Sequence, residues 1–149
     1  MTRIAVLFLT LFLALPAAGE VRKPEVFSVL GQAIKGYDPV AYHLERRPVR
    51  GDPEISYEWN GATWLFASPA NRVRFIADPE RWAPQYGGYC AWAITRGRTA
   101  PVDPTIFRVV DDKLYLNLNM KVHREWLAEM PLMISRGDAN WPDVLVLGK

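Results

Sequence analysis

Three side chains in the sequence can act as soft or borderline metal ligands through nitrogen or thiolate: His43, Cys90 and His123. Met120 adds a thioether three residues before His123. Thiolate, imidazole and thioether together suit copper, and Cu(I) in particular selects sulfur ligands. We therefore expect Cys90 and His123, with His43 or Met120 as a further ligand, to converge and bind a copper ion in its reduced state.

Cys90 is the single cysteine of the 149-residue chain, so it cannot form an internal disulfide. Gly87 and Gly88 lie just upstream and let the backbone turn sharply, which can direct amide N–H groups at the sulfur and make the thiolate available. Two alternatives to the metal site stay open. In one, Cys90 is the nucleophile of a thiol-dependent redox protein or enzyme with His123 as its base. In the other, Cys90 is a buried side chain of a non-catalytic module whose aromatic surface binds a small molecule or a partner protein.

Composition excludes several classes of protein. The formal net charge is +2, from 18 Lys and Arg against 16 Asp and Glu, and this small excess argues against a nucleic-acid binder. The six tryptophans and six tyrosines argue against intrinsic disorder. The sequence has no G-x-S-x-G elbow, no H-E-x-x-H pair and no C-x-x-C motif, so the usual hydrolase and dithiol signatures are missing.

Residues 1–19 have the order of a secretory signal peptide, with Arg3 near the start, a short apolar run and small residues before an expected cut after Gly19. The apolar run is shorter than the roughly 20 residues that a membrane-spanning helix needs. We therefore expect a periplasmic or secreted protein without a membrane anchor. Residues 20–28 are expected to be a poorly structured lead-in, and residues 29–149 to form one domain without an internal repeat.

The fold that must position the candidate ligands is predicted to contain a β-hairpin that turns at Asn60-Gly61. Asn60-Gly61 is the preferred two-residue type I′ turn, because both residues tolerate positive φ. The turn fixes the register, with one aromatic face buried and one face toward water. The predicted pairs are Trp59–Ala62, Tyr57–Trp64 and Ile55–Phe66 on the aromatic face and Glu58–Thr63 on the other.

Capping residues predict the helices. Ser68-Pro69 begins a helix that should end before Asp78-Pro79, and this second Asp-Pro pair opens a short helical turn that Pro84 ends. A second hairpin should turn at Asp111-Asp112. These elements predict an α+β domain in which small antiparallel β-hairpins pack with short helices.

Asn119 is expected to cap a last helix that runs from Met120 to Met130 and is stopped by Pro131. Met120, His123, Leu127 and Met130 would form one stripe on that helix. His43 follows Tyr42 in an expected loop. The histidines and the cysteine are therefore far apart along the chain, and only the fold can bring them together.

Several segments resemble the exported YHS domain-containing proteins of bacteria. They are KGYDPVAYH (35–43), ATWLFASPANRVRFIADPERWAPQYGGYCAWAI (62–94), KLYLNLN (113–119) and NWP (140–142). They occur in the order of that family and extend over nearly all of the chain after the leader.

The resemblance implies the framework of a metal-associated module without its cysteine ligands. The smaller YHS module is similar to pieces of heavy-metal and copper transport proteins, in which cysteines follow D-P-V-C and F-C-S-x-x-C patterns. On this chain those cysteine positions fall at Ala41, Ala67 and Asn71, and all three lack sulfur. The ligand set of that module is therefore not transferred, and a metal would have to use Cys90 with other partners.

Overall fold

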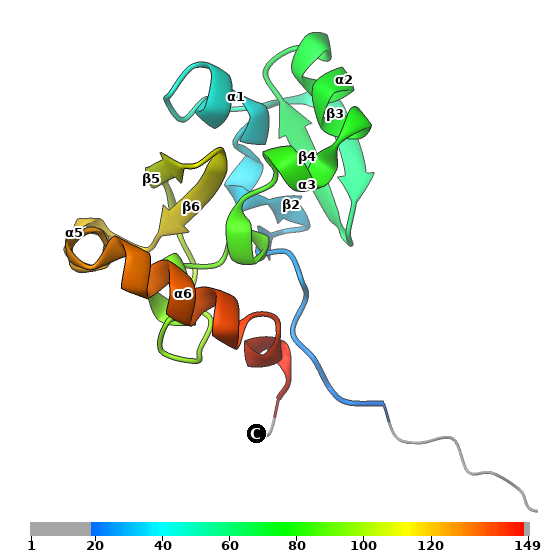
Figure 1. The fold of residues 1–149 in the computed structure, drawn as a ribbon. Coiled ribbons are helices and arrows are strands. Elements are labelled where there is room, and N and C mark those ends of the chain that lie inside the picture. Colours follow the sequence, from blue (N-terminus) through cyan, green and yellow to red (C-terminus); the bar gives the residue numbers. More distant parts are fainter. Residues whose placement is uncertain (1–18, 148–149) are drawn as a thin grey trace, which may run out of the picture.

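The structure, a computed structural model, describes residues 19–147 (Figure 1). The expected leader, apart from Gly19, lies outside the described residues. The elements in chain order are β1 Ser28–Val29, β2 Gln32–Ala33, η1 Ile34–Gly36, α1 Pro39–Leu44, β3 Asp52–Trp59, β4 Ala62–Phe66, α2 Pro69–Ala77, α3 Pro79–Trp82, η2 Gln85–Gly88, α4 Ala91–Ile94, β5 Asp103–Val110, β6 Lys113–Asn117, α5 Met120–Ala128, α6 Met130–Asn140 and η3 Asp143–Leu145.

The strands form a four-stranded sheet in the order β1-β2-β4-β3 and a separate two-stranded sheet, β5-β6. The expected α+β domain of β-hairpins and short helices is confirmed. The larger sheet is mixed, because β2 pairs with β4 in parallel through Gln32 and Thr63. All other strand pairs are antiparallel.

Two successive half-units of the chain, residues 34–82 and residues 86–133, share one order of elements. Each begins with three consecutive residues of positive φ, at 42°, 57° and 79° in residues 34–36 and at 57°, 60° and 83° in residues 86–88. Left-handed backbone is unfavourable outside glycine, so three such residues in a row at both places form a specific shared feature. A short helix, α1 or α4, follows in each half-unit.

A hairpin and a capped helix of equal lengths then follow in both half-units. β3 and β5 have eight residues, β4 and β6 have five, and α2 and α5 have nine. Asp52 and Asp103 begin the long strands, each followed by proline, and Ser68 and Asn119 cap the helices. The expectation of a domain without an internal repeat is therefore wrong for the fold. Side-chain differences hide the repeat in the sequence, whereas backbone lengths and dihedral angles retain it.

The register of the first hairpin is confirmed for Trp59–Ala62, Tyr57–Trp64 and Glu58–Thr63. The predicted Ile55–Phe66 pair is wrong, because the ladder shifts between Asp52 and Ser56 and Phe66 pairs with Asp52. Pro53 lies in the shifted segment and has no N–H to donate, so a regular ladder cannot continue through it.

The second hairpin turns at Asp111-Asp112, as predicted, and both aspartates have positive φ. Its ladder shifts between Asp103 and Phe107, where Pro104 removes a donor in the same way.

The predicted end of the last helix is wrong. α5 ends at Ala128, Glu129 leaves helical geometry at φ −129° and ψ 39°, and Pro131 lies in the first turn of α6 instead of ending α5. Proline fits this place because the first-turn amides of a helix have no intrahelical acceptor. The predicted stripe is also wrong in part: Met120 and Leu127 are exposed, while the buried residues of α5 are Val122, His123 and Trp126.

Residues 20–28 have little regular structure, as expected, but they are tied to the rest of the chain. The amide of Lys23 donates to the carbonyl of Leu145 at 2.8 Å, and the amide of Phe27 donates to the carbonyl of Gly87 at 2.9 Å. The side chain of Val26 is buried. This lead-in therefore forms part of the folded surface beside the C-terminal helix, as its blue trace beside α6 shows in Figure 1.

The core consists of two clusters of buried side chains. The first combines side chains of both half-units and includes Tyr42, Trp64 and Phe75 from the first and Cys90 and Leu116 from the second. The second lies mainly in the second half-unit and includes Ile94, Tyr115, Trp126 and Leu145. Between Gly19 and Leu147, no helix is long and apolar enough to cross a membrane.

Candidate functional site

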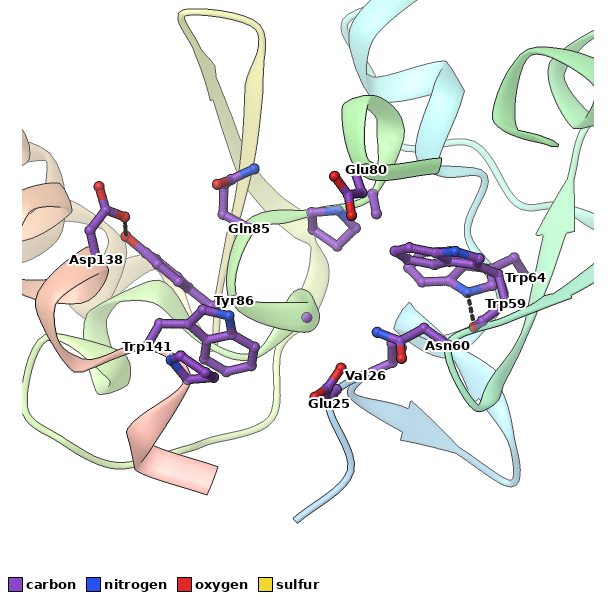
Figure 2. Close-up of a pocket in the computed structure, with 14 residues that line it drawn as sticks. Glu25, Val26, Trp59, Asn60, Trp64, Glu80, Gln85, Tyr86, Asp138 and Trp141 are labelled. Atoms are coloured by element: carbon purple, nitrogen blue, oxygen red, sulfur yellow. Dashed lines mark hydrogen bonds between the residues drawn. The ribbon is translucent and has the colours of Figure 1, made fainter. Parts of the chain in front are cut away.

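A cavity of about 450 Å³ opens between the first hairpin and the C-terminal part of the chain. Its lining combines indole and phenol rings with carboxylates (Figure 2). The lining residues are Glu25, Val26, Trp59, Asn60, Trp64, Glu80, Ala83, Pro84, Gln85, Tyr86, Gly87, Asp138, Trp141 and Pro142. This volume is in the range of cavities that hold small organic ligands.

One wall is built by the first hairpin. Trp59 ends β3, Asn60 follows in the turn, and Trp64 lies on β4. The indole N–H of Trp64 donates to the carbonyl of Trp59 at 3.0 Å, and the two ring centroids are 5.8 Å apart. Trp64 is fully buried and supports the half-buried Trp59 from behind. The accessible ring of this wall therefore belongs mainly to Trp59.

The opposite wall is built by Tyr86 and Trp141, whose ring centroids are 6.0 Å apart (Figure 2). The hydroxyl of Tyr86 donates to Asp138 Oδ1 at 2.9 Å and lies 3.3 Å from the carbonyl of Ile134. Burial, and next the bond to Asp138, raise the pKa of Tyr86 far above its ordinary value, so the phenol stays protonated. A Cβ on Gly137 would lie 2.5 Å from this hydroxyl, so the close contact of Tyr86 with α6 requires glycine there.

The lead-in closes the cavity at one side with Glu25 and Val26. Gly87 allows this contact, because a Cβ at that position would lie 1.7 Å from the carbonyl oxygen of Glu25. Gly87 also has a φ of 60°. Gly87, the first of the two glycines upstream of Cys90, therefore positions the lead-in against the cavity.

Cys90 and His123 meet at a third residue, Asn117, which ends β6. The thiol of Cys90 lies 3.6 Å from Asn117 Oδ1, and Asn117 Nδ2 lies 3.0 Å from His123 Nδ1. The backbone amide of Trp92 donates to the same Oδ1 at 3.1 Å. Because a backbone N–H can only donate, Oδ1 must face Trp92, and Nδ2 must face His123 as a donor. His123 therefore accepts through an unprotonated Nδ1.

The environment of this network keeps His123 neutral. Cys90, Asn117 and His123 are all buried, with only 1 % of Cys90 exposed. Burial lowers the pKa of His123, and the positive charge of Arg108 lowers it further. Cys90 and His123 thus share a hydrogen-bond partner, and neither residue lines the cavity.

The first half-unit has the corresponding network, centred on the buried Asp38. Asp38 Oδ1 accepts from the amide of Val40 at 2.8 Å, as Asn117 Oδ1 accepts from the amide of Trp92. Asp38 Oδ2 accepts from the amide of Ala67 at 2.8 Å and from Asn71 Nδ2 at 2.7 Å. The three positions at which the resemblance places cysteines, Ala41, Ala67 and Asn71, all donate to this one carboxylate.

His43 lies elsewhere. It belongs to α1 rather than to the expected loop, because Asp38 caps this helix and Pro39 occupies its first turn. Its ring packs edge-on against Trp82 at 5.4 Å between centroids. Burial lowers the pKa of His43, and its Nε2 is buried without a hydrogen-bond partner among the described residues. The fold does not bring His43 into the Asn117 network.

Within residues 19–147, no group of three or more His, Cys, Asp or Glu side chains is arranged to hold a metal ion. Copper binding by Cys90, His123 and His43 therefore stays a prediction.

Comparison of the chain with protein-family models, with curated proteins and with solved structures finds no match.

Sequence reasoning missed the residues that build the cavity. Glu25 lies in the expected unstructured lead-in, and Asp138 and Trp141 lie beyond the expected last helix. The sequence patterns predicted no functional residue in either segment. A sequence signal for the repeat does exist. Asp52-Pro53 begins β3 and Asp103-Pro104 begins β5, and the hairpin turns at Asn60 and Asp111 follow at the same distance along the chain. No local pattern links Trp59 to Trp141, because only the packing of the first hairpin near the C-terminal segment brings them to one cavity.

Proposed function

We propose that this protein is a non-catalytic binding protein that holds a small organic molecule in the cavity between Trp59 and Trp141. The observation that supports this proposal is the lining itself: aromatic rings from the hairpin face rings from the C-terminal segment around about 450 Å³. Aromatic surface with a few polar groups is the usual composition of a small-molecule site.

The chemistry of the lining favours binding over catalysis. Among the described residues that form it, none is a serine, threonine, cysteine or histidine, so the lining holds no nucleophile paired with an imidazole base. The thiol of Cys90 is almost fully buried and bonded to Asn117 outside this lining. Cys90 fits a packing role beside a capping amide better than attack on a substrate.

Ligand binding can be tested by NMR titration of ¹⁵N-labelled protein with neutral, anionic and cationic small molecules. We expect at least one chemical class to shift the indole resonances of Trp59 and Trp141. Trp141→Leu should weaken that binding at least tenfold, while Trp141→Phe should retain most of it. Trp92→Leu is the matched control, since Trp92 is a half-buried tryptophan outside the cavity. Absence of shifts at the cavity with all three classes would refute the proposal.

A second candidate function is the binding of reduced copper by Cys90 and His123. It is favoured by one observation, namely that both side chains contact the amide of Asn117. Titration of Cu(I) under a competing chelator should show tighter binding by wild type than by Cys90→Ser or His123→Ala. Equal affinity of wild type and Cys90→Ser would exclude this function, and His43→Ala tests whether the third predicted ligand contributes.

We place either function outside the cytoplasm, on the leader-like sequence of residues 1–19. A cut after Gly19 would leave the whole lead-in, including Glu25, on the mature chain. N-terminal sequencing of protein from the envelope fraction should begin at Glu20, and recovery of the intact chain from Met1 would contradict export.

A further inference from the structure

The cavity is acidic as well as aromatic. Its lining contains three carboxylates, Glu25, Glu80 and Asp138, and the described part of the lining contains no lysine, arginine or histidine. The salt bridge found within residues 19–147 joins Arg47 to Glu45, and none there pairs a lysine, arginine or histidine with these three carboxylates. Asp138 accepts from the hydroxyl of Tyr86, whereas Glu80 lies above and Glu25 below the gap between the aromatic walls in Figure 2.

The aromatic rings of the cavity lack the internal cations that accompany aromatic rings elsewhere in the protein. Arg50 lies over Tyr37, Arg81 over Trp82, and Arg96 over Trp92, at 4.8, 5.0 and 3.7 Å from the ring centroids. In the part of the chain that the structure describes, no arginine or lysine is placed in this way over Trp59 or Trp141. These two indoles therefore line the cavity without a described internal cation over their rings.

An indole face attracts a cation through its quadrupole, most strongly where water is excluded. A neutral ligand in this cavity would cover Glu25 and Glu80 without compensating their charge, and an anion would be repelled by them. Covering a carboxylate with a positively charged group avoids that cost. Ring faces and carboxylates therefore favour the same sign of ligand charge.

We infer that the ligand of this cavity is an organic cation, an amine or quaternary ammonium compound whose charged group lies between the faces of Trp59 and Trp141 and near Glu25 and Glu80. This inference rests on the proposed function and specifies the chemical class of its ligand. The volume of about 450 Å³ leaves room for an apolar or aromatic portion beside the ammonium group.

The test is calorimetric titration with choline and with 3,3-dimethylbutan-1-ol, a neutral molecule of the same shape, followed by benzyltrimethylammonium as a larger cation. We expect at least one of the two cations to bind at least tenfold more tightly than the alcohol at low salt, and this preference to decrease as the salt concentration rises. Glu25→Gln and Glu80→Gln should each weaken cation binding several-fold and leave binding of the alcohol unchanged. Glu54→Gln, an exposed glutamate outside the cavity, is the matched control.

The possible failures are distinguishable. If the alcohol or an anionic compound binds in the cavity as tightly as the cations, the inference about charge is wrong and the proposed binding function stands. If Glu25→Gln and Glu80→Gln bind cations as tightly as wild type, the inference is likewise wrong. If no class of compound shifts the resonances of Trp59 and Trp141, both the inference and the proposed function fail.

Discussion

Cys90 stands at the position in the second half-unit that Asp38 holds in the first. Each directly precedes a short helix, α1 after Asp38 and α4 after Cys90. The carboxylate of Asp38 caps its helix, whereas a thiol is a weak acceptor and Cys90 makes no capping bond. Asn117 supplies the missing acceptor from β6 and connects it to His123. In the second half-unit, the side chain of Asn117 therefore caps α4 in place of the residue that precedes the helix.

Replacing Asn117 with aspartate should raise the pKa of His123. A carboxylate can still accept from the amide of Trp92, but it has no N–H for Nδ1 of His123 and favours a protonated imidazole instead. NMR titration of the His123 ring should show a higher pKa in Asn117→Asp than in wild type. Asn60→Asp, the same change in an exposed turn, should leave it unaltered. An unchanged value in Asn117→Asp would mean that the side chain at position 117 does not contact Nδ1 of His123.

Stability should decrease on mild acidification because of the histidines. Burial lowers the pKa of both His43 and His123 below the ordinary value of 6.5, so the unfolded chain binds a proton more readily than the folded one. The stabilisation is complete above pH 6.5 and is lost as the pH falls from there through the lowered values. The free energy of unfolding in urea should fall between pH 7.5 and pH 5.

The share of His123 in this loss can be measured with His123→Gln, whose amide oxygen can still accept from Asn117. This variant should lose less stability over the same pH interval, and His43→Gln should remove the remaining histidine contribution separately. A loss in His123→Gln as large as in wild type would show that His123 is not held neutral by the fold.

Gly87→Ala should detach the lead-in from the domain. Its Cβ would lie 1.7 Å from the carbonyl oxygen of Glu25, which backbone atoms cannot accommodate without moving apart. Hydrogen exchange of the Phe27 amide, which donates to Gly87, should become faster. Gly97→Ala is the matched control, because Gly97 has a similar φ of 69° but nothing within 4 Å of its Cβ position. Equal protection of Phe27 in both variants would contradict the close contact.

Trp64→Ala should destabilise the domain by about 3–5 kcal/mol, the usual cost of removing a buried large aromatic side chain. Trp64 is fully buried, and its ring centroid lies 5.1 Å from that of Phe75 and 5.8 Å from that of Trp59. Trp64→Phe should cost clearly less, because most of the apolar contact is kept. Urea unfolding of both variants measures the difference, and an unchanged midpoint in Trp64→Ala would place this ring outside the core.

The sequence by itself determined the hairpin turns and the helix starts, because these depend on residues next to one another in the chain. Asn60-Gly61 specifies its hairpin turn because both residues tolerate positive φ, and Ser68-Pro69 and Asn119 specify helix starts because their side chains accept from free first-turn amides. Two prolines, Pro53 and Pro131, nevertheless make the structure differ from the register and the helix end that the sequence predicted. Pro53 lies where the ladder shifts, and Pro131 belongs to the beginning of a helix rather than to the end of one.

Only the tertiary structure decided which of these elements meet. The sequence singled out Cys90 and His123, but it could not show that Asn117 stands between them in the hydrogen-bond network, since that depends on how β6 packs beside α4 and α5. It gave no sign that Glu25, Trp59 and Trp141 share a cavity, because they come from three distant segments and no periodic pattern joins them. Caps and turns are fixed by neighbours in the chain, whereas a binding cavity is fixed by contacts between distant segments, and those depend on packing across the whole domain.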